Sequence, residues 1–440
     1  MPAELPNNAA TNGWYNVLPE PAAARQVSGT IRVPYAVLGA GVTGLSAARQ
    51  LATHLPDEEI VLIEAERVGF GTSGRNSGFV LGNHFHGGDV PFEDPELVAA
   101  QARLSSGGLN LLRELVKDHG IECGWHDWGK LHVSAGIEGD VGLEGFVKGY
   151  KALGIPAEEL DADKVAAVTG STFYTAGLKV EGTGLMNPAA MCRGLGETLP
   201  ANVTLYENTP VHRLERGQPS RLITENGEVI ADQLILCTNV FSPALGFSKS
   251  DMVPVVIYAS LTRPMTVLEQ AEIGGDQAGF GLLPAAHGGS TVRRTPDGRI
   301  LMRNSFGYGP GDTSNPDMLA RAQANHIESI KKRWPQLQDF EMGLEIEHTW
   351  GGVLGITRNT GHVFGEIQKG IWGSIGCNGA NVARGTMSGA LIADMIVGDT
   401  SDLLTDQQSV PRPSWLPPDP LRKLVARQRI KRMDKASAER

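Results

Sequence analysis

The hydrophobic pattern near the start of the chain predicts a βαβ unit. Residues 35–38 form a short apolar run that ends at Gly39, as a buried parallel strand would. Apolar residues then recur at helical spacing over 45–55, and a second apolar run, 60–63, ends at Glu64. A strand, a helix and a second strand in this order are typical of a parallel sheet covered by helices.

Further along the chain, the same pattern predicts a mixture of helices and strands. Helices are predicted over 95–120, 321–334 and 386–397, and Pro335 ends the second of them. Strands are predicted over 203–215, 229–238, 253–265 and 299–303. We therefore expect an α/β protein (α+β overall), and 440 residues are enough for two or three domains.

Glycine is the unusual feature of the composition. It supplies 55 of the 440 residues, against a typical ~7%. Seven glycines fall within 69–88 and eleven within 351–389, without the G-X-Y period of collagen. Glycine at this density in a folded chain suits tight turns and backbone that approaches a ligand closely.

The first glycine cluster fits a dinucleotide-binding motif. Gly39-Ala40-Gly41-Val42-Thr43-Gly44 matches G-x-G-x-x-G and lies between the predicted strand and helix. Its glycines allow the tight turn, the approach of a pyrophosphate and close packing of helix on strand, while the helix N-terminus attracts phosphate. Glu64 follows Gly44 by twenty residues and can accept hydrogen bonds from both ribose hydroxyls. We predict dinucleotide binding by this unit.

The segment 69–88 favours FAD over NAD. An NAD-binding domain would normally continue into another regular βα unit, whereas this segment is small, polar and rich in glycine. Such a backbone can wrap a large planar cofactor, and Ser73, Arg75, Asn76 and Ser77 offer hydrogen-bonding groups to it. A flexible surface loop and an NAD-dependent dehydrogenase stay as alternatives.

Charge and cysteine usage exclude several other classes. The net charge of −10 argues against nucleic acid as a main partner. The four cysteines lie far apart with no C-x-x-C pair, so we predict neither a metal site nor a disulfide framework. No stretch approaches the roughly 20 apolar residues of a spanning helix, and the first residues do not resemble a signal peptide. We expect a cytoplasmic protein.

Four segments resemble the FAD-dependent D-amino-acid oxidase/glycine oxidase superfamily: VLGAGVTGLSAARQLA, IEAERVGFGTSGRNSG, TVRRTPDGRIL and WGGVLGITRN…GSIGCNGANVARGTMSGALIADMI. Within it, the chain most resembles gamma-glutamylputrescine-oxidase-like amine oxidoreductases over residues 30–400. The resemblance implies a glutathione-reductase-2/D-amino-acid-oxidase-like fold: a Rossmann-like FAD-binding domain with a parallel sheet and a substrate domain with a mainly antiparallel sheet. The implied parts are an N-terminal arm (1–30), the FAD-binding domain (31–94, 182–248 and 347–402), the substrate domain (95–181 and 249–346), and a C-terminal tail and helix (403–440).

The resemblance also implies where the cofactor is held. The glycine-rich loop before the last predicted helix would face the flavin pyrimidine, where N–H groups stabilise the negative charge of reduced flavin. Motif and resemblance together give these FAD-binding residues: Gly39, Gly41, Val42, Thr43, Gly44, Glu64, Ala65, Ser73, Gly74, Arg75, Asn76, Ser77, Gly78, Val211, Thr238, Asn239, Gly352, Gly376, Asn378, Gly379, Asn381 and Val382. We expect non-covalent FAD, with covalent attachment through a histidine of His84-Phe85-His86 as an alternative.

The reaction implied is oxidation of a C–N bond. The α-hydrogen of an amine or amino acid leaves as hydride to flavin N5, and the imine then hydrolyses. In relatives, an arginine near the segment TVRRTPDGRIL binds the substrate carboxylate. This makes Arg294 a candidate, although Arg293 aligns equally well. Arg303 and Trp350 are further candidates for the substrate cavity, as are Asn304 and Asn359, where the chain departs from the relatives.

Other functions and partners stay open. A flavin-dependent 2-hydroxy-acid dehydrogenase would need a base, with His84 or His348 as the catalytic candidates, and a flavin-binding subunit without turnover is a third hypothesis. The expected partners are the small substrate and oxygen or another electron acceptor. Residues 421–440 carry eight Lys/Arg and two acidic residues, which predicts a surface helix docked on the acidic body, with peripheral membrane contact as an alternative.

Overall fold

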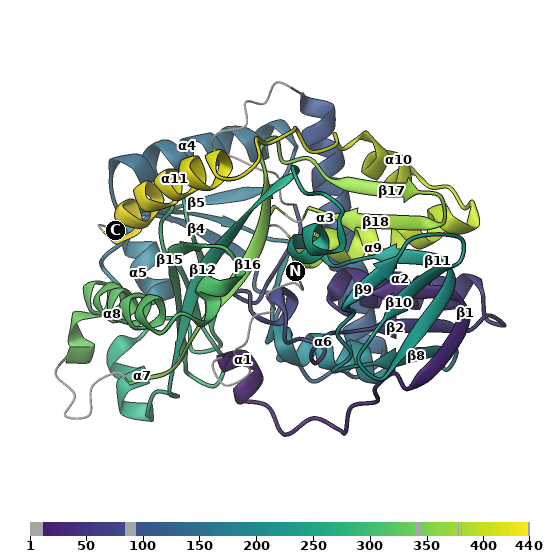
Figure 1. Cartoon of the computed structure of the whole chain (residues 1–440). Helices are drawn as coiled ribbons and strands as arrows, with labels where there is room; N and C mark the ends of the chain where they lie inside the picture. Colours follow the sequence, from purple (N-terminus) through teal and green to yellow (C-terminus); the bar gives the residue numbers. More distant parts are fainter. Residues whose placement is uncertain (1–11, 84–93, 339–344, 377, 380, 439–440) are drawn as a thin grey trace.

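The chain folds around two large sheets, seen side by side in Figure 1. The computed structural model describes residues 12–83, 94–338, 345–376, 378–379 and 381–438. In these residues, two eight-stranded sheets are joined by a two-stranded one, β3 (Phe79–Leu81) with β7 (Thr183–Leu185). One large sheet is mainly parallel and the other mainly antiparallel, which confirms the predicted fold class.

The first sheet contains the predicted βαβ unit. β1 (Gly29–Leu38) pairs in parallel with β2 (Ile60–Ile63) on one side and with β11 (Gly227–Leu236) on the other. The strand order is β17 (Val363–Gln368), β18 (Ile371–Ile375), β11, β1, β2, β8 (Val203–Tyr206), with β10 (Ser220–Ile223) and β9 (Arg213–Glu215) added beside β11. The strand predicted over 203–215 is therefore two strands, because Pro210 and the left-handed Asn208 interrupt it.

Helices cover one face of this sheet. The covering helices are α2 (Val42–His54), α3 (Pro95–Asp118), α6 (Pro188–Glu197) and α9 (Asn381–Val397), and their apolar residues share one core with β1 and β2. α2 and α9 pack closely, and a Cβ on Gly389 would lie 2.1 Å from the carbonyl oxygen of Thr43. This contact brings the N-terminal and C-terminal parts of the chain together at the glycine motif.

Along most of the second sheet, helices pack against only one of the two faces. Its order is β16 (Ile346–Thr357), β12 (Met252–Thr262), β15 (Ile300–Tyr308), β14 (Thr291–Arg294), β13 (Phe280–Pro284), β4 (Lys130–Ser134), β6 (Ala176–Val180), β5 (Ala157–Asp161). On one face its side chains share a core with α5 (Ala162–Thr169), α7 (Val267–Ile273) and α8 (Pro316–Arg333). α4 (Ile137–Ala152) covers the β4–β6 end of the other face.

The predicted division at residue 347 does not match the strands. Residue 347 lies inside β16, which pairs with β12 of the second sheet along its length. The chain returns to the first sheet only at β17. Likewise, α3 was expected in the substrate domain, yet it packs on α9 and on α10 (Asp402–Ser409). Sheet pairing and helix packing are non-local, so the sequence motifs did not reveal these boundaries.

The first and the last described helices both pack on the body. In the arm, α1 (Gly13–Asn16) buries Trp14, whose Nε1 donates to the carbonyl oxygen of Asn76 at 2.8 Å. At the other end, α11 (Leu421–Ala438) lies on β15 and runs across the second-sheet side of the molecule (Figure 1). Among the described residues, no helix combines the length and apolar character needed to cross a membrane. Short 3₁₀ helices complete the chain at Thr72–Gly74, Asn239–Leu245, Pro310–Ser314 and Pro335–Gln338.

Candidate active site

Two cavities meet where the first sheet faces the second. The smaller, of about 160 Å³, lies at the carboxyl ends of β1, β2 and β11. The larger, of about 1270 Å³, lies between the segment 72–81, the second sheet and α4. Thr72 lines both cavities. In a parallel α/β sheet this edge is where ligands bind, so the geometry suits one long ligand that occupies both spaces.

The glycine motif builds the wall of the smaller cavity. Gly39 has φ +101°, a left-handed conformation that favours glycine. A Cβ on Gly44 would lie 1.9 Å from the carbonyl oxygen of Gly39, so only glycine lets α2 begin this close to β1. The Val42 N–H donates to Ser73 Oγ at 3.1 Å, which ties the helix start to the segment 69–88. This is the cradle that a dinucleotide pyrophosphate requires.

Glu64 sits at the end of β2 and is held by backbone. Its carboxylate accepts hydrogen bonds from the N–H of Ala40 at 2.8 Å and of Glu66 at 3.1 Å. Burial raises the pKa of this carboxyl, and the two N–H donors oppose that rise. Because the carboxylate lines the cavity and has acceptor capacity left, it fits the hydroxyl groups of a ribose.

The described part of the glycine-rich segment, residues 69–83, is fastened to the second sheet. Thr72 Oγ1 donates to the carbonyl oxygen of Val353 at 2.6 Å. Arg75 is 3% exposed, and its guanidinium donates to the carbonyl oxygens of Phe70 and Gly351. Burial lowers the pKa of Arg75 to about 10. These contacts fix the segment between the two cavities, as a wall for a planar ring requires.

Most predicted cofactor residues line one of the two cavities. Those on the smaller cavity are Gly39, Gly41, Thr43, Glu64, Ala65, Ser73, Thr238, Asn239 and Gly376. Those on the larger cavity are Arg75, Asn76, Ser77, Gly352, Asn378, Gly379 and Val382. Val42, Gly44, Gly74, Gly78 and Val211 line neither, because they pack behind the walls or in the core. Asn381 begins α9, and its side chain is not among those described.

Arg303 is the predicted substrate residue that faces the larger cavity. On β15 it pairs with Ala259 and Thr291, so these three side chains share the open face of the second sheet. Its Nη2 donates to Thr291 Oγ1, while its Nε is buried without a partner in the described residues. No carboxylate forms an ion pair with it there, and burial lowers its pKa to about 10. A half-buried cation that lines a cavity and has no carboxylate partner suits an anionic ligand.

Arg294 lies away from the cavity. Alternation along β14 points it to the opposite face of the sheet from Thr291 and Arg303, where it donates to Gly274 and Gln277. Arg293 shares the face of Arg303 but lines neither cavity, because Nη1 donates to the carbonyl oxygens of Gly78 and Met186. Both arginines therefore hold the fold together.

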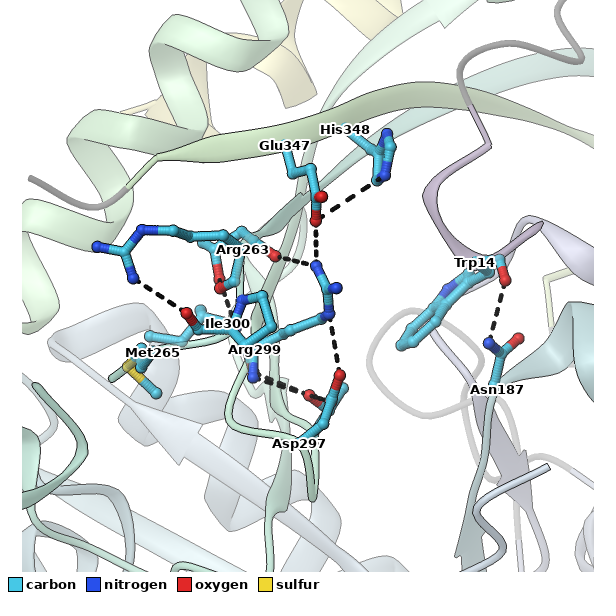
Figure 2. A network of polar contacts seen from close by, with 12 residues as sticks. Trp14, Asn187, Arg263, Met265, Asp297, Arg299, Ile300, Glu347 and His348 are labelled. Atoms are coloured by element: carbon cyan, nitrogen blue, oxygen red, sulfur yellow. Dashed lines mark hydrogen bonds and ion pairs between the residues drawn. The ribbon is translucent and has the colours of Figure 1, made fainter. Parts of the chain in front are cut away.

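Trp350 and His348 also lie outside both cavities. Trp350 is fully buried beside Trp14, and its Nε1 donates to the carbonyl oxygen of Arg75. Figure 2 shows His348 next to Glu347, in the polar network around Arg299. Of the two candidate bases, His348 is thus remote and His84 lies outside the described residues.

The two asparagines proposed as substrate contacts have structural partners instead. Asn304 Nδ2 donates to Ser290 Oγ and Ser329 Oγ on the helix-covered face of the second sheet. Asn359 Nδ2 donates to the carbonyl oxygen of Arg412, and its Oδ1 accepts from the Ser414 N–H. Asn359 therefore fastens the segment that leads to the C-terminal helix.

The sequence analysis missed a polar group in the wall of the larger cavity. His132 of β4 lines it, is 4% exposed, and stacks on Phe146 with ring centroids 4.1 Å apart. Its Nε2 lies 3.1 Å from the hydroxyl of Tyr150. Burial, aided by Lys130, holds the pKa of His132 well below its usual value, so the ring is neutral. The alternation of side-chain directions along β4 could have indicated that His132 shares one face of the sheet. No sequence motif, however, connected this strand to the site.

Comparison with known proteins shows the family of the chain. A family model described as FAD dependent oxidoreductase (DAO) matches residues 35–395. Gamma-glutamylputrescine oxidoreductase from Escherichia coli is 26% identical over 375 residues, which cover 82% of this chain and 83% of the relative. The activity in that name is the relative's own.

Solved structures share the fold at lower identity. Glycine oxidase from Geobacillus kaustophilus has a TM-score of 0.69 and 18% identity, over 84% of this chain and 96% of that one. The dithionite-reduced L-α-glycerophosphate oxidase from Mycoplasma pneumoniae, solved with FAD bound, has a TM-score of 0.65 and 17% identity, over 87% and 97%. The glycine cradle, Glu64 and the wall at 72–78 fit FAD. The chain therefore belongs to the DAO family of FAD-dependent oxidoreductases.

Proposed function

We propose that this enzyme oxidises the C–N bond of an amine that carries an anionic group, as an amino acid does. The observation that carries the proposal is Arg303, a cavity-lining guanidinium without a carboxylate partner. The described carboxylates on the larger cavity, Glu138 and Glu144, are exposed on α4. An anionic substrate would neutralise Arg303, whereas a substrate with only positive charge would leave it unpaired.

The chain's own residues would orient the substrate and exclude water. Bound FAD supplies the acceptor for a hydride from the substrate carbon. Arg303 would bind the anionic group, with Thr291 Oγ1 fixing the guanidinium. Ile257, Leu354 and Phe306 supply apolar wall around the reacting carbon. The product imine would then take up water and release the nitrogen, so oxidation needs no protein base when the amine binds neutral.

A substrate panel tests the reaction class. The purified flavoprotein is mixed anaerobically with three matched compounds: an amino acid, the same amine without the carboxylate, and the 2-hydroxy acid of the same skeleton. We expect loss of flavin absorbance with the amino acid alone, and admission of oxygen then shows whether oxygen is the acceptor. Bleaching by the 2-hydroxy acid alone would favour the dehydrogenase instead, for which the neutral His132 in the cavity wall is the candidate base. No bleaching by any substrate class would favour a subunit without turnover.

Variants of the cavity test the role of Arg303. Arg303→Gln should lower kcat/KM for the amino acid by roughly 10- to 100-fold, since hydrogen bonds to a charged group are lost. Lys148→Gln removes a positive charge from the exposed rim of the same cavity and should change kcat/KM little. Equal losses in the two variants would show that general electrostatic attraction, and not Arg303, binds the substrate.

A further inference from the structure

The outward side of the C-terminal segment exposes large apolar side chains. Trp415, Leu421, Leu424 and Val425 are 65%, 60%, 68% and 63% exposed. In the described residues, ten large apolar side chains are exposed, and these four fall within 415–425. Leu421, Leu424 and Val425 stand at helical spacing on one side of α11. Such a concentration is typical of a surface that meets a partner.

Contacts on the inward side of α11 fix this orientation. Ile430 is 7% exposed and Asp434 is 5% exposed. Asp434 accepts a hydrogen bond from the Phe306 N–H at 3.0 Å and forms an ion pair with Arg321. The end of β15 extends beyond its pairing with β14, so α11 supplies the partner there. The apolar side chains therefore face outward because the opposite side of the helix is already engaged.

Positive charge surrounds the exposed apolar residues. Arg429, Lys431 and Arg432 are exposed on the outward side of the helix. Lys423 and Arg427 are also exposed but lie toward the body, where the Arg427 guanidinium stands over the Tyr308 ring. Between residues 421 and 433 there is no acidic residue, and Asp434 is buried and paired. The chain as a whole carries a net charge of −10, so this helix is opposite in sign to the rest of the molecule.

We propose that this surface, Trp415 with the outward side of α11, docks on an anionic lipid membrane. Leu421, Leu424 and Val425 would enter the boundary between headgroups and acyl chains, with the cations on the anionic headgroups. Pairing of α11 with α11 of a second copy would bring like charges together, which disfavours a symmetric dimer through this surface. Each cation near an anionic surface contributes roughly a fivefold gain in affinity. The three outward cations, Arg429, Lys431 and Arg432, therefore act together with the apolar residues.

Docking would hold the substrate cavity beside the lipid. Met433, on α11, lines the larger cavity, and the backbone of Met433 contacts Gly288 of the same cavity wall. On α4, Ile137 and Val141 line this cavity and are 83% and 66% exposed. The helix that binds lipid is thus also part of the cavity wall.

The test is co-sedimentation of the purified flavoprotein with vesicles. One set is phosphatidylcholine alone, and the other contains about one third phosphatidylglycerol. We expect binding to the anionic vesicles only, with a loss of at least about tenfold when salt rises from about 0.1 M to about 0.5 M. Leu421→Ser/Leu424→Ser/Val425→Ser and Lys431→Glu/Arg432→Glu should each weaken binding at least about tenfold while flavin content and turnover in solution stay unchanged.

A matched control distinguishes binding through this surface from nonspecific binding through any exposed apolar side chain. Val267 and Leu268 of α7 are 82% and 75% exposed, and Val267→Ser/Leu268→Ser should bind anionic vesicles like the unchanged enzyme. The proposal is overturned if the unchanged enzyme does not bind anionic vesicles, or binds neutral ones equally well. It is also overturned if the triple serine variant converts an oligomer into a monomer in light scattering, because a second copy would then cover the surface.

Discussion

The two cavities differ in what forms their walls: backbone forms most of the smaller one, and side chains form most of the larger one. The smaller is shaped largely by backbone at the ends of parallel strands, with Gly39, Gly41 and Glu64 close together in one βαβ unit. The larger takes its polar side chains from separate strands, with His132 on β4, Thr291 on β14 and Arg303 on β15. A backbone cradle tolerates almost no change, whereas a wall of side chains can be altered one residue at a time. The function of the smaller cavity should therefore fail abruptly on mutation, and that of the larger cavity gradually.

The largest effect is expected at Gly44. Gly44→Ala places a Cβ 1.9 Å from the carbonyl oxygen of Gly39, so β1 and α2 must move apart. We expect loss of bound FAD and a drop in the free energy of unfolding of about 3 kcal/mol or more. Flavin absorbance of the purified protein and thermal unfolding measure both.

Gly145→Ala is the control for that substitution. Gly145 lies in the interior of α4, where a Cβ meets nothing within 4 Å. It should keep its flavin and gain about 0.5–1 kcal/mol in stability, because alanine favours the helix. If Gly44→Ala also keeps its flavin, the backbone of the cradle can shift to accommodate a Cβ, and the expected difference between the two cavities is wrong.

The next effect concerns the buried ammonium group beside the substrate cavity. Lys130 is fully buried on β4, its Nζ donates to the carbonyl oxygens of Gly82 and Asn83, and burial lowers its pKa to about 7 from 10.5. Between these two values the unfolded chain binds the extra proton, so stability should fall as pH decreases from about 10 to about 7. The expected slope is up to about 1.4 kcal/mol per pH unit, and it should end below about pH 7.

Lys130→Met should remove that slope even if its absolute stability is lower. Urea unfolding at several pH values between about 7 and about 10 measures the slope for each protein. Lys117→Met, at an exposed position on α3, controls for loss of an ammonium group. An unchanged slope in Lys130→Met would show that Lys130 is not the group that titrates.

The smallest effect is expected at Thr291, the acceptor for Arg303. Thr291→Val removes one hydrogen bond but keeps the shape of the side chain. KM for the anionic substrate should rise roughly three- to tenfold with kcat little changed, since a net hydrogen bond contributes about 1 kcal/mol. Thr291→Ser keeps the hydroxyl and should restore KM. If serine and valine behave alike, the hydroxyl does not position the guanidinium.

The sequence was most informative where one short segment makes a whole feature. The motif at 39–44 and Glu64 lie within one βαβ unit, and both reach the smaller cavity. Val42 and Gly44 belong to the same motif but pack behind it, because a motif shows which residues the turn needs and not which of them touch the ligand. Val211 was assigned from resemblance alone; it lines neither cavity, and its half-buried side chain packs against the core.

The substrate side was less predictable because strand pairing decides which face a residue occupies. One step along β14 separates Arg293, which is held by Gly78 and Met186, from Arg294 on the opposite face. Arg303 reaches the cavity because its register with Thr291 places it on the open face. Trp350 and His348 share the face of Gly352 on β16, yet they lie farther along the strand, where α1 packs over them and closes them off from the cavity.

By itself, the sequence determined the βαβ unit, the dinucleotide cradle, the FAD-binding class of protein and a basic C-terminal helix. Each of these can be predicted from residues that are close together in the sequence, since a turn, a cap or a helical repeat involves neighbouring residues. Only the tertiary structure decided that Arg303 faces the cavity, that His132 joins it from a distant strand, and which side of α11 is exposed. Those outcomes depend on sheet register and packing between segments far apart in the chain, where a one-residue shift exchanges cavity and core.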